Sequence, residues 1–145
     1  MATTAQFVAS PIIDITQIGP TANTGRTGGG TIGTDIFLVC SGPTFSGGSG
    51  VGKRITRGII HGVSANSSGI VRFFLSPDSG TTRRVILEKP VYGTTVSATT
   101  SAYRTEIPEL VGMVVPGVSG ANAYQIYAST HVTDTYNIII ESGVL

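Results

Sequence analysis

One stretch of the sequence, Gly69 to Glu88, constrains the fold more than any other. An apolar, aromatic and β-branched run, Ile70 to Leu75, is followed by a Ser-Pro-Asp-Ser-Gly turn and a second run, Arg83 to Leu87. Proline presets φ at a turn, and Gly80 can adopt the positive φ that a chain reversal needs. The pattern therefore predicts a β-hairpin. Because apolar residues outnumber polar ones on both faces of both arms, we expect this hairpin to be central in a sheet with one face fully buried.

The composition agrees with a sheet protein. Charged residues make up only 12% of the 145 residues, and glycine, serine and threonine take their place. Such a composition favours short strands joined by many turns over helices, which carry charged residues on their exposed faces. It is also typical of a surface that neighbouring subunits cover. The length favours one domain, so we expect an N-terminal arm at residues 1–10 and a single β-sandwich domain at 11–145.

About eight strands at fairly even spacing can be placed along the chain, and no window shows convincing helical periodicity. We therefore expect an all-β fold, an antiparallel β-sandwich of the jelly-roll type, with very little helix. Pro108 is expected to bend or end its strand because it cannot donate to a central ladder. Apart from the hairpin arms, the runs with strand character are Pro11–Ile18, Thr31–Ser41, Lys53–Val63, Val91–Val96, Thr99–Val111, Ala123–Ala128 and Tyr136–Glu141.

Alternation along a strand also predicts which side chains face the core. In the first strand we expect Ile13, Ile15 and Ile18 to face inward. In the strand that starts at Lys53, the residues predicted to share one face are Ile55, Arg57, Ile59, His61 and Val63.

A glycine-rich motif, Gly47 to Lys53, matches the first seven positions of a phosphate-binding P-loop. Arg54 stands where that motif needs serine or threonine for magnesium. The residues after it have glycine and β-branched character and predict a strand, whereas a P-loop leads into a helix. We therefore interpret the motif as an inter-strand loop and expect no nucleotide cofactor.

Other candidate chemistry is sparse. His61 and His131 are far apart, with no carboxylate or cysteine at metal-ligand spacing, so we expect no metal site. Cys40 follows an apolar run and is interpreted as a small buried hydrophobe. The spacing alone leaves a glycosidase pair open among Glu88, Glu106 and Glu109. The chain lacks tryptophan and gathers no aromatic platform for a sugar, which argues against a glycosidase and against a carbohydrate-binding module.

The charge pattern bears on partners and location. The net charge of +1 gives no electrostatic footprint for nucleic acid or an anionic membrane. No apolar run approaches the roughly 20 residues of a membrane span, and the first residues lack the features of a secretion signal. We therefore expect a soluble chain, made and kept in a cytoplasm.

Three stretches carry a resemblance to a known class: Thr21–Ile36, Gly69–Leu75 and Tyr127–Ile139. In this order they resemble a type of small structural protein of tailed bacteriophages. The resemblance implies a virion protein of jelly-roll-like fold, a capsid decoration (cement) protein that forms homotrimers on the major capsid protein and assembles in the host cytoplasm. It brings no catalytic residues, and phage β-sandwiches serve in both heads and tails.

On this basis we expect a non-enzymatic protein whose contacts lie in the N-terminal arm and in two loops, Gly19–Gly30 and Gly42–Gly52, which we interpret as flexible segments that order against a partner. The residues predicted to contact the partner are Phe7, Arg26, Lys53 and Arg54. One alternative is a tail or head-fibre component, or a receptor- or carbohydrate-binding module, which predicts an exposed cluster among Tyr92, Tyr103, Tyr124 and Tyr127. Another is an enzyme or nucleotide-binding protein that uses Lys53.

Overall fold

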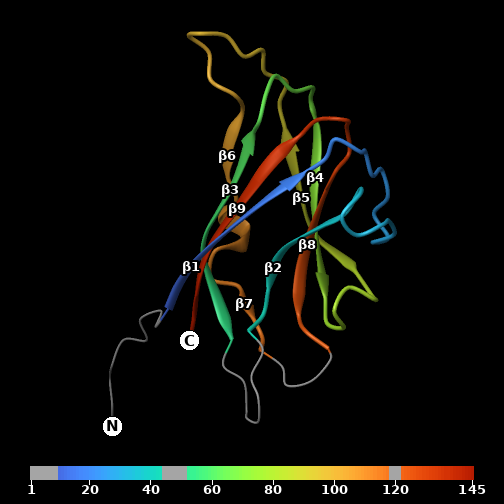
Figure 1. Cartoon of the computed structure of the whole chain (residues 1–145), viewed down its shortest axis with the longest axis vertical. Helices are drawn as coiled ribbons and strands as arrows, with labels where there is room; N and C mark the ends of the chain where they lie inside the picture. The colour runs from blue at the N-terminus through green and yellow to red at the C-terminus, as the bar shows by residue number, and fades with distance from the viewer. Residues whose placement is uncertain (1–9, 44–51, 118–121) are drawn as a thin grey trace.

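The structure is a computed structural model that describes residues 10–43, 52–117 and 122–145. Two antiparallel sheets pack face to face in it, which confirms the predicted β-sandwich (Figure 1). The predicted arm at 1–10 lies outside the described residues except for Ser10, as does most of the loop Gly42–Gly52. The described elements are β1 (Ser10–Ile18), β2 (Phe37–Ser41), β3 (Lys53–Gly62), β4 (Gly69–Ser76), β5 (Arg84–Val91), β6 (Arg104–Glu106), η1 (Pro108–Leu110), β7 (Val114–Val115), β8 (Gln125–Thr130) and β9 (Tyr136–Val144).

The order of the strands is that of a jelly roll. The first sheet has the order β1-β9-β3-β6, with the short β7 also on β3, and the second has the order β2-β8-β4-β5. Pairs are nested along the chain, β4 with β5, β3 with β6, β2 with β8 and β1 with β9. This is the arrangement that results when one long antiparallel hairpin is wrapped into a sandwich of two four-stranded sheets.

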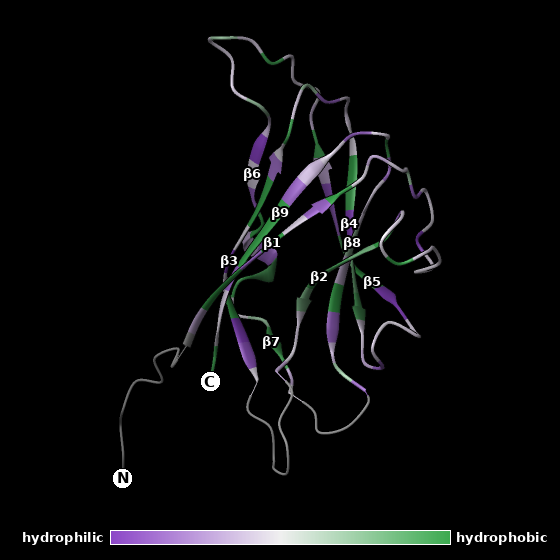
Figure 2. Cartoon of the chain, in the orientation of Figure 1, coloured by the Kyte–Doolittle hydropathy of each residue, from purple (hydrophilic) through white to green (hydrophobic). Residues whose placement is uncertain are grey.

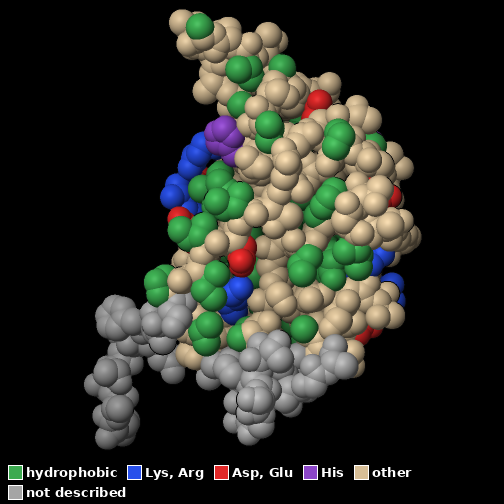
Figure 3. All heavy atoms as spheres, in the orientation of Figure 1, with side chains coloured by type: hydrophobic (Ala, Val, Ile, Leu, Met, Phe, Trp, Pro, Cys, Tyr) green, Lys and Arg blue, Asp and Glu red, His purple; other side chains and the backbone are tan. Residues whose placement is uncertain are grey.

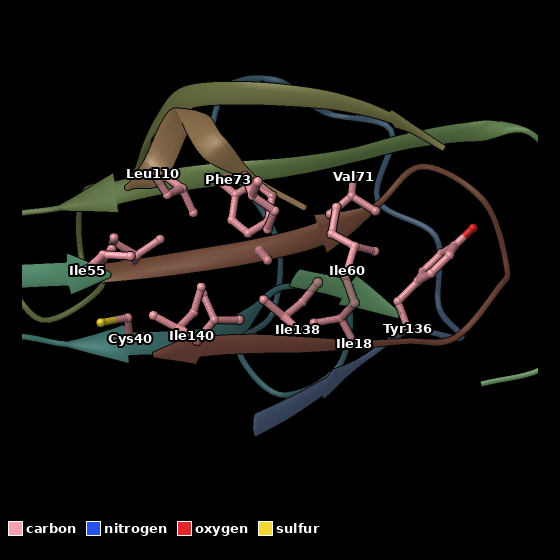
Figure 4. Packing of buried hydrophobic residues seen from close by; sticks show 14 of the residues in the cluster. Ile18, Cys40, Ile55, Ile60, Val71, Phe73, Leu110, Tyr136, Ile138 and Ile140 are labelled. Carbon is pink, nitrogen blue, oxygen red and sulfur yellow. The ribbon is translucent and has the colours of Figure 1, made fainter. Parts of the chain in front are cut away.

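The core lies between the two sheets. Figure 4 shows Phe73 and Val71 of the second sheet facing Ile138 and Ile60 of the first. β4 is hydrophobic along much of its length, whereas β6, at the edge of the first sheet, is hydrophilic (Figure 2). Burial of this aliphatic and aromatic layer, at about 25 cal/mol per Å² of apolar surface, is the main force that holds the sheets together.

The hairpin predicted at Gly69–Glu88 is confirmed, and one of its arms is central. β4 lies between β8 and β5. β5, however, forms the edge of the second sheet, so the expectation that both arms are central was wrong for it. The turn between the two arms forms as predicted. The Ser76 hydroxyl accepts a hydrogen bond from the Gly80 amide, and Gly80 has φ of 91°.

Three predicted strands are shorter than expected. The run Thr31–Ser41 begins with a turn at residues 33–35, where the amides of Thr34 and Asp35 donate to the Thr31 carbonyl. β2 begins only at Phe37. Val91–Val96 contributes only the last residue of β5 and a single bridge at Thr94. Thr99–Val111 contributes β6, which ends before Pro108 as predicted.

A bulge in β3 overturns the predicted face of that strand. The register against β9 shifts between Ile55 and Arg57, so one extra residue interrupts the alternation. Ile55 and Ile60 face the core as a result, and Ile59 lies on the opposite, outer face. Val63 lies beyond the strand and is exposed.

The face of β1 that points into the sandwich is also not the one predicted. Ile13 and Ile15 are 64% and 65% exposed, and only Ile18 is buried as expected. The reason is Asp14, which has the opposite orientation and reaches the ammonium group of Lys53 between the sheets. Ile12 and Thr16 share this inward face because side chains alternate along a strand.

Candidate functional site

The four predicted contact residues do not form one site. Phe7 lies outside the described residues. Arg26 reaches Glu88 on β5, at the outer face of the second sheet, with 2.6 Å between Nε and Oε1. Arg54 is exposed on β3. Its side chain lies on the outer face of the first sheet, whereas that of the preceding residue, Lys53, faces inward. A contact between these residues and a partner stays a prediction, and it would have to involve two separate surfaces.

Lys53 is nearly buried, with 8% of its side chain exposed. Its ammonium group donates to the Asp14 carboxylate at 3.1 Å and to the Ser41 carbonyl at 3.2 Å. It therefore ties the inward faces of β1 and β3 to β2, and β3 continues from it as a strand, as predicted. A P-loop lysine must instead project from a glycine-rich loop into a helix N-terminus, so the geometry around Lys53 does not resemble a phosphate site.

A groove of about 200 Å³ lies beside Lys53, between the edge strands β1 and β2. Cys40 lines it and is otherwise buried, as the sequence predicted. Burial raises the pKa of its thiol to about 11, and the positive charge of Lys53 offsets only part of this effect. The thiol is therefore protonated near neutral pH, which makes it a poor nucleophile and a poor metal ligand.

The outer face of the second sheet is covered by the chain itself. Residues 19–36, here called the cover segment, lie over β4 and β8 (Figure 1). Ile36 at the end of this segment packs on Phe74 and Tyr127 and forms a second small core. The loop Gly19–Gly30, expected to be a flexible partner contact, is thus bound to the sheet.

Two arginines hold the cover segment in place. Arg72 is fully buried and donates to the Asn23 carbonyl, to Glu88 and to Nδ1 of His131. Since a guanidinium can only donate, His131 must accept through Nδ1. Arg83 donates to the carbonyls of Gly28 and Gly30. These bonds replace water at backbone groups that a glycine-rich segment would otherwise leave exposed.

Glu88 closes this network at the surface. Its Oε1 accepts from both Arg72 and Arg26, and hydrogen bonding by Arg72 is the largest cause that holds the pKa of the Glu88 carboxyl below its usual range. The carboxylate is therefore neutralised within the chain. Glu106 and Glu109 likewise pair within the chain, with Arg57 and Lys89.

The outer face of the first sheet has no comparable cover among the described residues. The register places Ile15, Ile139 and Ile59 side by side in one row across β1, β9 and β3. Ile13 extends this row along β1, where it lies opposite Glu141 of β9. Ile13 and Ile15 are strongly exposed, whereas Ile59 is buried, so the exposed part of the row lies on β1. Figure 3 shows hydrophobic side chains over β1 and β9, with basic and acidic side chains at the rim over β3 and β6. We call Ile13, Ile15, Ile59 and Ile139 the aliphatic row.

The rim beside the aliphatic row is an ion-pair strip. Glu106 accepts from Arg57, with 2.7 Å between Oε1 and Nη2, and from Arg104 at 3.1 Å. The hydrogen bond from Arg57 is the largest cause that lowers the pKa of the Glu106 carboxyl. An apolar strip with a charged border is the arrangement common at protein contact surfaces.

An aromatic pair lies in the connection between β5 and β6. Tyr92 is 67% exposed and packs edge to face against Tyr103, with ring centroids 6.4 Å apart. Tyr127 is buried under the cover segment, so the cluster of four tyrosines considered from the sequence does not form. The exposed part of it is the single pair.

Comparison with known proteins gives no match: no family model, no curated protein and no solved structure corresponds to the chain. Within the described ranges, no group of three or more histidine, cysteine, aspartate or glutamate residues is placed to hold a metal ion. The described part of the chain also has no helix long and apolar enough to cross a membrane.

Sequence reasoning missed the aliphatic row and the buried arginine. The row could not be found because β1 has isoleucines on both faces, so alternation alone does not show which set is outward. Arg72 did carry a signal, since a single arginine in the middle of an apolar run such as Ile70–Leu75 must find a partner if the run is buried. Its cross-strand position opposite Glu88 supplies that partner.

Proposed function

We propose that this chain is a non-enzymatic structural protein of a tailed-phage particle, a capsid decoration (cement) protein that binds as a homotrimer across subunits of the major capsid protein. The jelly-roll sandwich is compatible with this role, and the sequence resemblance noted above suggested it. The observation that carries the proposal is the exposed part of the aliphatic row, Ile13 and Ile15, which no described residue covers, whereas residues 19–36 cover the outer face of the second sheet over β4 and β8.

The physical role of such a protein is to add buried area across joints in a shell. Packaged DNA loads these joints, and a bound oligomer resists their opening. Each contact can be modest, because several simultaneous contacts raise the overall affinity by orders of magnitude, about 10² to 10⁴. The rigid sandwich keeps Arg54 and the aliphatic row at fixed positions relative to one another.

Co-sedimentation tests this proposal directly. The purified protein is mixed with empty shells of the phage that encodes it, and bound protein is measured in the pellet. We expect saturable binding at a fixed ratio to capsid subunits and a higher melting temperature of the shell. Protein that stays in the supernatant at every concentration would refute the cement role.

A matched pair of variants sharpens this experiment. Arg54→Glu reverses a charge on the outer face of the first sheet, and Arg84→Glu does the same on the exposed edge strand β5. We expect the first variant to weaken shell binding at least tenfold and the second to leave it within about twofold. Equal effects of the two variants on shell binding would contradict a specific contact between the first sheet and the shell.

The pair of Tyr92 and Tyr103 favours a second candidate, a receptor- or glycan-binding module of the tail or head fibre. An exposed tyrosine ring held by a second ring can stack on the apolar face of a sugar. Screening the protein on a glycan array with Tyr92→Ala as the control tests it. A signal that the variant loses would favour this candidate, and no signal from the unaltered protein would dismiss it.

A further inference from the structure

The sheet edges differ in how they are protected against pairing with another chain. Soluble β-proteins blunt exposed edges with short strands, bulges, charged residues and proline. β6 and β7 have three and two residues. β5 has a register shift against β4 and carries Arg84, Glu88, Lys89 and Pro90.

β2 is protected by its short length, by a register shift and by side chains at its free edge. It has five residues and a register shift between Leu38 and Cys40. Side chains from the first sheet also occupy its free edge, because Thr16 Oγ1 donates to the Leu38 carbonyl and Lys53 donates to the Ser41 carbonyl. A strand from another molecule would have to displace both bonds.

β1 has fewer of these protections than the other edges. It has nine residues and pairs with β9 in continuous register from Ser10 to Ile18, without a bulge. Within the described ranges, no backbone hydrogen bond reaches it from any element other than β9. Its one charged side chain, Asp14, faces inward; an inward charge can limit pairing at an edge, but this one is already paired with Lys53. Pro11, near its start, is the one residue that limits pairing there.

We propose that β1 is an interaction edge that pairs antiparallel with β1 of a second copy of this chain, about a two-fold axis. The two first sheets then join into one continuous sheet, and the free backbone groups of both edges are satisfied at once. An added strand also covers the groove between β1 and β2, which opens beside Asp14 and Ile15.

The side chains of β1 fit a copy of the same strand. In antiparallel pairing about a two-fold axis, opposite residues have positions of the same parity, so outward residues meet outward residues. When the axis passes through residue 13 or 15, that isoleucine lies opposite its own copy, and Asp14 lies opposite Ile12 or Thr16. An axis through residue 14 would place the two Asp14 carboxylates opposite each other and is therefore disfavoured. No outward charge on β1 opposes another, and apolar β-branched cross-strand pairs stabilise sheets. The aliphatic row also continues across the junction.

The mass of the assembled protein tests this inference, which does not depend on the proposed function. A two-fold axis requires an even number of copies, so sedimentation of the unaltered full chain should give a dimer, or a hexamer if trimers pair. Either mass supports pairing through β1, but a dimer would contradict the homotrimer of the proposed function, whereas a hexamer agrees with both. A monomer or a lone trimer at 100 μM would overturn the inference. A trimer that binds shells would overturn it while supporting the cement role.

A variant at the edge completes the test. I13K/I15K places two charges on outward, exposed positions of β1 and should halve the mass with an unchanged circular dichroism spectrum. I15K alone serves if the double variant does not fold. The matched control is Ile86→Lys on the other long edge, β5, which should leave the mass unchanged. An unchanged mass in the β1 variants, or a halved mass in the control, would contradict pairing through β1.

Discussion

The two outer faces of this sandwich differ in what covers them. On the second sheet, residues 19–36 fold back over β4 and β8, and Arg72 and Arg83 donate to their carbonyls. On the first sheet, Ile13 and Ile15 are exposed beside a charged rim. The difference shows that a glycine-rich segment, expected to be flexible, can be packed on a sheet, while apolar residues of a regular strand, expected to face the core, can be exposed. Here the glycine-rich loop is packed on the sheet, and the regular strand β1 leaves apolar side chains exposed.

The largest expected effect comes from removing the buried arginine under the cover segment. Arg72→Ala deletes a fully buried side chain and leaves Glu88 and the Asn23 carbonyl without their donor. We expect a loss of about 2–4 kcal/mol in the free energy of unfolding, because the substitution leaves a cavity in place of a fully buried side chain and removes the donor of the Asn23 carbonyl. Urea unfolding measures it. Arg84→Ala, at an exposed position on the neighbouring edge strand, is the control and should cost about 0.5 kcal/mol or less.

A second prediction separates two contributions to the stability of the cover segment: its contact with Arg83 and the positive φ of its glycines. Gly28 and Gly33 both have positive φ, 82° and 84°. A Cβ at Gly28 would collide with the Arg83 carbonyl oxygen, whereas a Cβ at Gly33 meets nothing within 4 Å. Gly33→Ala should therefore cost about 1 kcal/mol for φ alone, and Gly28→Ala about 2–3 kcal/mol. Equal losses in thermal unfolding would mean that the segment does not rest on Arg83.

The third prediction concerns pH. Hydrogen bonds from Arg72 and Arg26 lower the pKa of Glu88 in the folded chain. A carboxyl whose pKa is lower in the folded than in the unfolded state stabilises the fold above its unfolded pKa, and this stabilisation is lost as the pH falls through the folded value. The stability gap between the unaltered protein and Glu88→Gln should be present at pH 7 and should narrow below pH 4. A gap of the same size at pH 7 and pH 2 would contradict this origin.

The smallest expected effect on the stability of the single chain is on the first sheet. Ile13→Thr and Ile15→Thr alter exposed positions and keep β-branched side chains, so each should change the free energy of unfolding by less than about 0.5 kcal/mol. Measured at low protein concentration, a loss of 2 kcal/mol or more would show that these residues belong to the fold of the single chain rather than to a contact surface.

Much of the fold could be predicted from the sequence, because turns and apolar runs are local signals. The hairpin of β4 and β5, the break at Pro108 and the burial of Cys40 all follow from residues close together in the chain. The order of the strands does not, since β1 pairs with β9 from the other end of the sequence.

The surfaces were harder to predict because each depends on a contact between distant residues. Asp14 faces inward only because Lys53 lies there, and this orientation turns Ile13 and Ile15 outward. One extra residue in β3 likewise moves Ile59 to the outer face. The cover segment has the composition of a mobile loop, and the residues that fix it in place, Arg72 and Arg83 among them, lie some 50 residues away.

Hydrogen exchange at two protein concentrations tests the pairing most directly. It shows whether a second copy binds at β1, the edge strand of the first sheet, and not at β5, the edge strand of the second. The amides of the edge strands β1 and β5 are compared at 1 μM and 100 μM. The account predicts that β1 amides exchange more slowly at the higher concentration, while β5 amides exchange at the same rate at both. Slower exchange of β5 alone, or no dependence on concentration in β1, would contradict it.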